Sequence, residues 1–174
     1  MTSIINKVQT DIPSSTNLRI IDLLYSCNCW RFASDDKSAG RLDKVDRGLI
    51  LPSYADLDPS ARIESLNIYA NIILDAICHK SFFKYRIVRT FRWNWYHSNS
   101  QGDFHQDDQQ DNEISVIYNL HENDGGTEFR IGDKIEFFKA EPSQALIFPS
   151  KIFHRGIAPK EKSNRFCLNI ITEI

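Results

Sequence analysis

The N-terminal part of the chain carries apolar residues at the spacing of two helices. From Ser15 or Thr16, which are good N-cap residues, a first helix is predicted with an apolar face formed by Leu18, Ile21, Leu24 and Tyr25. A second helix is predicted after Asp58-Pro59-Ser60, a capping residue followed by a proline, and it ends near His79-Lys80. Its apolar face carries Ile63, Leu66, Tyr69, Ile73 and Ile77.

The segments around these helices have other patterns. Residues 1–14 predict a loose lead-in or an edge strand, and residues 28–33, with Trp30 and Phe32, alternate like a strand. Residues 34–48 are charged and contain Gly and Ser, which favours an exposed loop.

After residue 80 the hydrophobic period changes to that of short strands. Turn formers such as Asp124-Gly125-Gly126 and Gly132-Asp133 separate the β-rich segments, which are 85–92, 113–120, 127–130, 134–139, 144–148 and 165–172. Helices followed by many short strands predict an α+β fold, with the helices packed on one side of a β-sandwich or jelly roll. We expect one domain over 1–174, with a helical part at about 1–80 and a jelly-roll core at about 81–174.

Composition narrows the class of protein. The 174 residues are 41% hydrophobic and 25% charged, as in ordinary globular proteins, and the net charge of -2 disfavours indiscriminate nucleic-acid binding. No apolar run is long enough to suggest a signal peptide or a membrane span, so we expect a cytoplasmic protein without a membrane partner. The four cysteines lack zinc-site spacing and are expected to be free thiols.

Three residues have the chemistry of an iron site. His105 and Asp107 are two positions apart at the end of a long loop, so on an extended segment they point the same way and can share one ion. His154 follows the apolar segment 145–149 at a strand end. Two imidazoles and one carboxylate can occupy one face of an octahedral Fe(II) ion and leave the other face open. A His-x-Asp pair alone is weak evidence, and a hydrogen-bonded structural role is the alternative for His154.

Arg165 supplies a partner for a second ligand. It opens the final strand, which in an antiparallel jelly roll can be the neighbour of the strand before His154. A guanidinium binds a carboxylate through two parallel hydrogen bonds, so Arg165 could hold the distal carboxylate of a 2-oxo diacid that binds iron through its other end.

Two longer motifs carry a family resemblance. Gly125-Gly126-Thr127-Glu128-Phe129, followed by the segment from Phe148 to Gly156 with His154-Arg155-Gly156 at its end, resembles the Fe(II)/2-oxoglutarate-dependent oxygenase superfamily, in particular its prolyl-4-hydroxylase-like branch. The resemblance implies a double-stranded β-helix, a jelly roll. It also implies that His105, Asp107 and His154 bind iron and are catalytic, together with Arg165, which binds the C5 carboxylate of 2-oxoglutarate.

The same resemblance implies the reaction. We expect an Fe(II)- and 2-oxoglutarate-dependent dioxygenase that uses O2, is stimulated by ascorbate, and hydroxylates a C–H bond of a peptidyl or free amino acid or another small molecule. Asp107 stands where iron-dependent halogenases have a residue that does not bind the metal, which favours hydroxylation.

A second pattern is similar to AlkB-type nucleic-acid dealkylases. Asn94-x-Tyr96 precedes the His-x-Asp pair, as in that family, and on either resemblance Tyr96 is implied to bind 2-oxoglutarate. The AlkB pattern has a second arginine after the one at Arg165, and the segment 165–171 lacks it. Dealkylation of nucleic acid is therefore an alternative function, and a cupin-like binding module without turnover is another.

Further residues have two interpretations each. Asn94 and Tyr118 are candidates for contact with the co-substrate or are ordinary strand residues, and the Thr127 hydroxyl either binds the co-substrate or serves a turn. The aromatic residues Trp93, Trp95 and Tyr96 form either a substrate wall or part of the core. The arginines Arg89, Arg92 and Arg155 either clamp an anionic substrate or are solvated. The histidines His79, His97 and His121 lack partners at metal spacing, which favours surface positions. Within 107–111, only Asp107 has a stereochemical reason to bind metal, although the acidic cluster could attract a basic substrate.

Overall fold

The structure is a computed structural model that describes residues 4–27, 31–32, 49–51, 64–98, 100, 102–161 and 164–174. Its helices are α1 (Ser14–Ser26) and α2 (Glu64–Ser81). Its strands are β1 (Asn6–Gln9), β2 (Arg31–Phe32), β3 (Leu49–Leu51), β4 (Ile87–His97), β5 (Glu113–Asn119), β6 (Gly126–Ile131), β7 (Lys134–Lys139), β8 (Gln144–Pro149), β9 (His154–Ile157) and β10 (Asn164–Glu173).

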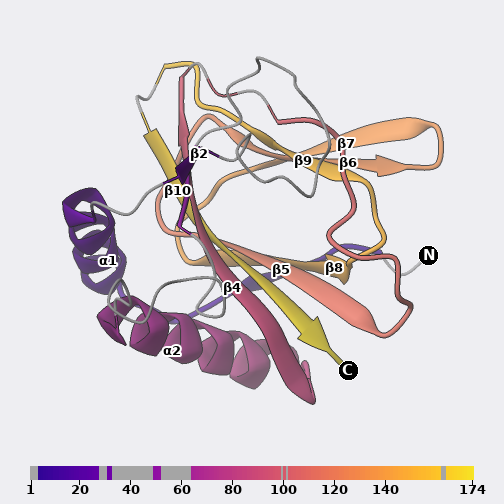
Figure 1. Ribbon diagram of the computed structural model, residues 1–174, viewed down its shortest axis with the longest axis horizontal. Helices are drawn as coiled ribbons and strands as arrows, with labels where there is room; N and C mark the ends of the chain where they lie inside the picture. Colours follow the sequence, from indigo (N-terminus) through magenta and orange to yellow (C-terminus); the bar gives the residue numbers. More distant parts are fainter. Residues whose placement is uncertain are drawn as a thin grey trace.

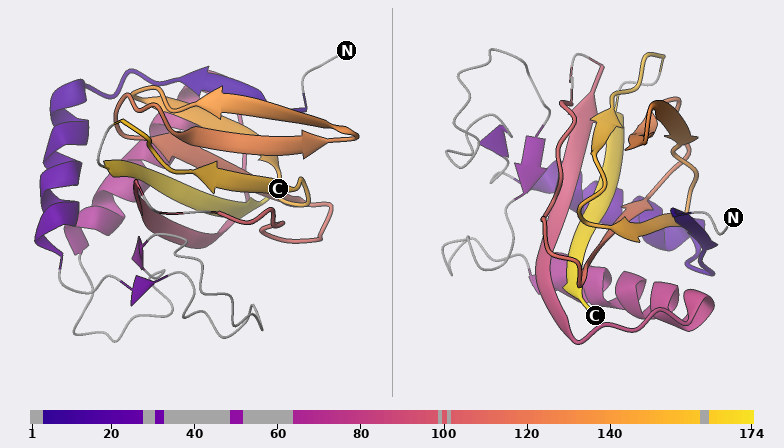
Figure 2. Two further views of the ribbon diagram at one scale, coloured as in Figure 1. Left: turned by 90° about the horizontal axis from the view of Figure 1, so that it is seen from above. Right: turned by 90° about the vertical axis from the view of Figure 1, so that its right-hand side faces the viewer.

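The strands form two antiparallel sheets. The large sheet has seven strands in the order β1-β8-β5-β10-β4-β3-β2, and the small sheet has three in the order β7-β6-β9. The small sheet lies over one face of the large sheet, and α1 and α2 lie on the other side (Figure 1 and Figure 2). Most of the described fold is β-sheet with two helices, which is consistent with a jelly roll.

Alternation along the strands of the large sheet divides the core in two. The first cluster, here the helix-side core, joins helix residues such as Ile20, Leu24 and Ile73 to every second strand residue, including Trp93, Val116, Tyr118, Phe166 and Leu168. The second, here the inter-sheet core, contains the intervening strand residues Ile117, Leu146, Phe148 and Cys167 together with Phe129 of the small sheet. Successive side chains of a strand point to opposite faces, so each strand serves both clusters.

The helices agree with the prediction in position and differ in detail. α1 begins one residue before Ser15, after Pro13, and buries Asn17, Ile20 and Leu24. The predicted apolar residues Leu18 and Tyr25 are 60% and 50% exposed, so that part of the predicted face is wrong. The face is rotated because Asn17 is buried by hydrogen bonds to Tyr118 and Ser143, which an apolar pattern cannot reveal. α2 buries Leu66, Ile73 and Ile77 as predicted, and its predicted start at Asp58-Pro59-Ser60 and Ile63 lie outside the described residues.

The strand predictions are confirmed for every segment after residue 80, with shifted ends. The first of them is displaced most: β4 begins at Ile87 and continues to His97, so it also includes the aromatic residues Trp93, Trp95 and Tyr96. β1 is an edge strand, and β9 was not predicted as a strand at all. Arg31 and Phe32 form β2, whereas 28–30 and the predicted loop 34–48 lie outside the described residues.

Two further predictions concern the whole chain. None of the described helices is long and apolar enough to cross a membrane. Among the described cysteines, Cys27, Cys78 and Cys167 are free thiols.

Candidate metal centre

His105, Asp107 and His154 converge at one end of the small sheet. Their ligand atoms all lie within 4.8 Å of one another. The Nε2 atom of His105 is 3.7 Å from Oδ1 of Asp107, and Nε2 of His154 is 3.6 Å from Oδ2 of the same carboxylate. The side chain of His154 is 3% exposed and that of His105 is 53% exposed, so the centre has a buried side and an open side.

Backbone pairing brings the two distant segments together. His105 and His154 form an antiparallel bridge in which each backbone N–H donates to the carbonyl oxygen of the other at 2.9 Å. The N–H of Asp107 donates to the carbonyl of Ser150 at 3.1 Å, which extends the pairing. The positions of His105 and Asp107 are therefore set by the segment that carries His154.

Both imidazoles are oriented in the same way. Nδ1 of His105 is 2.9 Å from the carbonyl oxygen of Asp103, and Nδ1 of His154 is 3.0 Å from that of Ile152. A carbonyl oxygen can only accept, so each Nδ1 carries a proton, and Nε2 is the nitrogen of each ring that is directed to bind a metal ion. Hydrogen bonds of this kind are the usual support of metal-binding histidines.

The carboxylate of Asp107 is held by two side chains from the large sheet. The hydroxyl of Ser115 on β5 donates a hydrogen bond to Oδ2 at 2.6 Å. The Nδ2 atom of Asn169 on β10 lies 3.5 Å from Oδ1. The hydroxyl of Ser115 is also 2.8 Å from that of Ser150. Such contacts fix the direction of a carboxylate that binds metal.

His154 is enclosed by aromatic rings of the inter-sheet core. Its ring centroid is 4.8 Å from that of Phe148 and 5.9 Å from that of Phe129. Burial lowers the pKa of His154 below its ordinary value, although the nearby Asp107 carboxylate opposes this shift. The environment therefore favours the neutral imidazole, the form that binds a metal ion.

Arg165 is a buried cation on β10. It is 1% exposed, and its guanidinium donates to the carbonyl oxygen of Gly126 at 2.6 Å and to the side-chain oxygens of Asn119 and Thr127, each at 3.2 Å. Its Nε atom is buried without a hydrogen-bond partner. No described carboxylate pairs with it, although a buried charge without an ionic partner is costly. The surroundings of Arg165 therefore suit an anionic ligand.

The predicted route by which Arg165 reaches the site is wrong. β8, the strand before His154, and β10 are not neighbours, because β5 lies between them. His154 itself belongs to β9 in the small sheet. Arg165 faces the hairpin residues Gly126 and Thr127 of β6, so contact across the two sheets brings it towards the site.

Tyr96 joins Arg165 to the small sheet. It lies directly opposite Arg165 in the β4–β10 pair, and the guanidinium carbon of Arg165 is 5.1 Å from its ring centroid. Desolvation raises the pKa of Tyr96 strongly, so its phenol remains a hydrogen-bond donor at any physiological pH. Tyr96 and Thr127 are thus both next to Arg165.

The structure separates the other predicted co-substrate residues. Asn94 is two positions from Tyr96 on the same face of β4, and its Nδ2 lies 3.8 Å from Sγ of Cys167. Tyr118 is not brought to the site: it belongs to the helix-side core, and its hydroxyl donates to Asn17 of α1 at 3.0 Å. The cause is strand alternation, since it is the adjacent Asn119 that faces Arg165.

The predicted aromatic wall is also divided by alternation. Trp93 and Trp95 pack in or against the helix-side core, so of these three residues only Tyr96 lies on the inter-sheet face. The remaining histidines are elsewhere: His79 is exposed at the end of α2, and Nε2 of His121 accepts a hydrogen bond from the backbone N–H of Phe166 at 3.3 Å. His97 ends β4.

Sequence reasoning missed Ser115, Asn119 and Asn169. Each is a buried polar residue within an apolar strand, and each contacts Asp107 or Arg165. That signal was present in the sequence, because isolated polar residues on the buried face of a strand need a partner.

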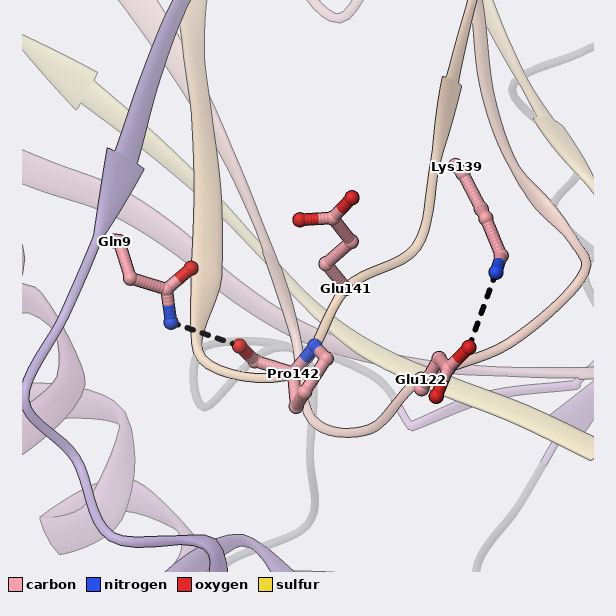
Figure 3. Close-up of a pocket in the computed structure, with 5 residues that line it drawn as sticks. All are labelled: Gln9, Glu122, Lys139, Glu141 and Pro142. Carbon is pink, nitrogen blue, oxygen red and sulfur yellow. Dashed lines mark hydrogen bonds and ion pairs between the residues drawn. The ribbon is translucent and has the colours of Figure 1, made fainter.

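The donor set and the arginine fit iron and a diacid. Two imidazole Nε2 atoms and one carboxylate match the preference of Fe(II) for imidazole with a hard oxygen ligand. The Nε atom of Arg165, which is buried without a hydrogen-bond partner, can donate a hydrogen bond to the carboxylate of a bound diacid. A polar surface pocket of about 320 Å³ is separate from this centre: it is lined by Gln9, Glu122, Lys139, Glu141 and Pro142, with an ion pair between Lys139 and Glu122 (Figure 3).

Comparison with solved structures gives the class of fold. The chain is similar to a prolyl hydroxylase from Trichoplax adhaerens in complex with a hypoxia inducible factor peptide fragment, with a TM-score of 0.69, 13% identity, and coverage of 99% of this chain and 84% of that one. It is similar to a Pseudomonas putida prolyl-4-hydroxylase, with a TM-score of 0.69, 12% identity, and coverage of 99% and 94%. It is also similar to HygX from Streptomyces hygroscopicus with nickel and 2-oxoglutarate bound, with a TM-score of 0.72, 9% identity, and coverage of 99% and 83%.

These likenesses are of fold. No protein-family model matches the sequence, and no curated protein matches it significantly. The resemblance to prolyl hydroxylases and 2-oxoglutarate-dependent oxygenases that the sequence predicted is confirmed at the level of the fold, and the His-Asp-His triad is present.

Proposed function

We propose that this protein is an Fe(II)- and 2-oxoglutarate-dependent dioxygenase that hydroxylates a C–H bond of an amino acid, free or peptidyl, or of another small molecule. The observation that carries the proposal is the pairing of two features: a triad of two imidazoles and one carboxylate, and a buried arginine without an acidic partner among the described residues. A simple metal-binding site needs the first feature and has no use for the second.

Each residue has a distinct role in this proposal. His105, Asp107 and His154 would hold Fe(II), which when bound supplies the activation of O2 and the oxidation of the diacid. Ser115 and Asn169 orient the carboxylate of Asp107. Arg165, with the Thr127 hydroxyl beside it, would bind the distal carboxylate of 2-oxoglutarate, and the phenol of Tyr96 would donate a hydrogen bond to it.

The fold, the domain organisation, the location and the effect of ascorbate that we expected from the sequence are part of the same proposal. We propose a double-stranded β-helix, helices packed on the large sheet, a single oxygenase domain over 1–174, a cytoplasmic location and stimulation by ascorbate. The neighbours leave the substrate open: one of them is in complex with a peptide, and HygX has nickel and 2-oxoglutarate bound, the latter being the co-substrate of the proposed reaction.

The proposal is tested by anaerobic titration of the protein with Fe(II) and 2-oxoglutarate. A 2-oxo acid that chelates Fe(II) gives a weak visible charge-transfer band, which we expect for the wild-type protein. His154→Ala should abolish the band, whereas His79→Ala, at an exposed helix end, should leave it unchanged. Absence of the band in the wild type, or its persistence in His154→Ala, would show that the iron assignment is wrong.

Turnover distinguishes an enzyme from a binding module. In air, the loaded wild-type protein should release succinate slowly without a substrate, and faster with the correct one. A protein that shows the charge-transfer band and releases no succinate would be a binding module. Alkylated oligonucleotides in the substrate panel test the AlkB-type alternative.

A further inference from the structure

Three arginines were candidates for an anion clamp, and the structure distinguishes them. Arg155 forms an ion pair with Glu128, with nitrogen–oxygen distances of 2.7 and 2.8 Å. Arg89 forms ion pairs with Glu173 and Glu113. Arg92 has neither an ion pair nor a hydrogen bond to any described residue, and its Nε atom is buried.

Arg92 faces the same interior as the metal centre. It lies on β4 two positions before Asn94 and four before Tyr96, so all three share the inter-sheet face of the strand, whereas Trp93 and Trp95 point to the helices. Arg92 is partly buried, so the guanidinium is not simply a solvated surface charge.

The cross-strand partner of Arg92 connects it to the triad. Arg92 lies directly opposite Asn169 of β10, and Nδ2 of Asn169 is 3.5 Å from Oδ1 of Asp107. The other polar atom of that amide, Oδ1, is buried without a hydrogen bond. Beside the metal ligand Asp107, Arg92 therefore has a buried donor, Nε, and Asn169 a buried acceptor, Oδ1, that form no hydrogen bond with the described residues. Buried polar atoms of this kind need a partner, which a ligand can supply.

The positions of the two unpaired arginines indicate different ligands. Arg165 lies opposite Tyr96, and Asn169, the partner of Arg92, is four residues further along β10. Four residues of a strand span about 13 Å. The carbon chain between the two carboxylates of a five-carbon diacid has four bonds and spans roughly 5 Å. A diacid that is bound by Arg165 and the metal is therefore too short to reach Arg92 as well. Arg92 is thus available to bind a different anion.

We propose that Arg92 binds the carboxylate of the substrate, and that the protein acts on a free amino acid. This rests on the proposed oxygenase function. A residue inside a peptide has its α-carboxylate converted to an amide, so unless its side chain is acidic it offers Arg92 no charge. Asn169 beside it provides an acceptor for a donor next to the carboxylate, such as an amino group.

The test compares carboxylates with matched neutral compounds. The iron-loaded protein is supplied with 2-oxoglutarate and each of the twenty free L-amino acids, their carboxamides, or peptides with blocked termini, and succinate is measured. We expect at least one free amino acid to accelerate succinate formation, and its carboxamide to lose the effect. Arg92→Gln should lower kcat/KM for that amino acid roughly ten- to a hundredfold, the loss expected for one charged hydrogen-bonded pair.

Controls separate this inference from the proposed function. In Arg92→Gln the charge-transfer band with 2-oxoglutarate should still form although the stimulated rate falls, and Arg155→Gln should leave the band, the unstimulated release of succinate and the stimulated rate unchanged. Equal stimulation by carboxamides or blocked peptides, no response to any free amino acid, or loss of the charge-transfer band in Arg92→Gln would overturn the inference. If the wild type lacks the charge-transfer band, it is the oxygenase function itself that fails.

Discussion

The ring of Tyr96 lies so close to Gly156 that a Cβ atom at position 156 would be 2.5 Å from both its Cζ and its hydroxyl oxygen. Gly156 is two residues after His154 on β9. Tyr96 belongs to β4 and lies opposite Arg165 of β10. The absence of a side chain at 156 therefore lets one tyrosine extend from the large sheet to the strand that carries a metal ligand. The two halves of the site are set at a fixed separation by this contact.

We expect Gly156→Ala to displace Tyr96 and to lower the free energy of unfolding by about 1–3 kcal/mol, the usual cost of overpacking a filled interior. The affinity for 2-oxoglutarate should also fall, because Tyr96 lies against Arg165. Denaturant unfolding and the charge-transfer titration measure the two effects. In a Tyr96→Ala background the stability cost of Gly156→Ala should shrink, and an undiminished cost would show that the contact is not its cause.

Ser115 should control the affinity for iron without touching the ion. In Ser115→Ala the carboxylate of Asp107 loses its 2.6 Å hydrogen bond, and we expect Fe(II) to bind about 10- to 100-fold more weakly. Ser150→Ala, one hydrogen bond further away, should have a smaller effect. Anaerobic competition with a metal-binding dye measures both affinities, and equal effects of the two variants would contradict the proposed order.

Arg165→Gln should separate binding of the co-substrate from binding of the metal. The variant retains hydrogen-bonding capacity but loses the buried charge, so we expect the dissociation constant for 2-oxoglutarate to rise about 100-fold, as for a lost charged pair. The affinity for Fe(II) should remain within a factor of two or so, because Arg165 does not contact the triad in the described structure. A parallel loss of both affinities would point to misfolding, which a circular dichroism spectrum would reveal.

Tyr118→Phe and Tyr96→Phe form a matched pair. Tyr118 donates its hydroxyl to Asn17 of α1, so its replacement should cost about 1 kcal/mol of stability and leave 2-oxoglutarate binding unchanged. Tyr96→Phe should weaken 2-oxoglutarate binding, because its phenol lies beside Arg165. If instead Tyr118→Phe weakened 2-oxoglutarate binding and Tyr96→Phe did not, Tyr118 would be the residue that contacts the co-substrate.

The metal-free protein should lose stability in mild acid because of His154. Burial lowers the pKa of this imidazole below the ordinary value of 6.5, so below that pH the unfolded chain gains a proton that the folded chain does not bind. The free energy of unfolding should therefore fall as the pH drops below 6.5, by at most about 1.4 kcal/mol per pH unit for one proton. Chemical unfolding in the presence of a chelator at several pH values should show a shallower slope for His154→Gln, while His79→Gln should behave like the wild type.

Local patterns predicted the elements better than the contacts between them. The strand segments after residue 80 were visible because polar and apolar residues alternate, and the triad was visible because His-x-Asp on an extended segment points both side chains one way. The strand at His154 was missed because β9 is only four residues long and follows a turn closely. The face of α1 was misjudged because the buried Asn17 is polar.

The sequence by itself determined which residues could bind iron and a diacid, since that chemistry depends on side-chain type and on spacing within one segment. Only the tertiary structure decided which of Tyr118 and Asn119 faces the site, that β5 separates β8 from β10, and that Arg92 remains unpaired among the described residues while Arg89 and Arg155 do not. Alternation shows that a strand has two faces, but which face meets the second sheet depends on the packing of segments distant in the chain.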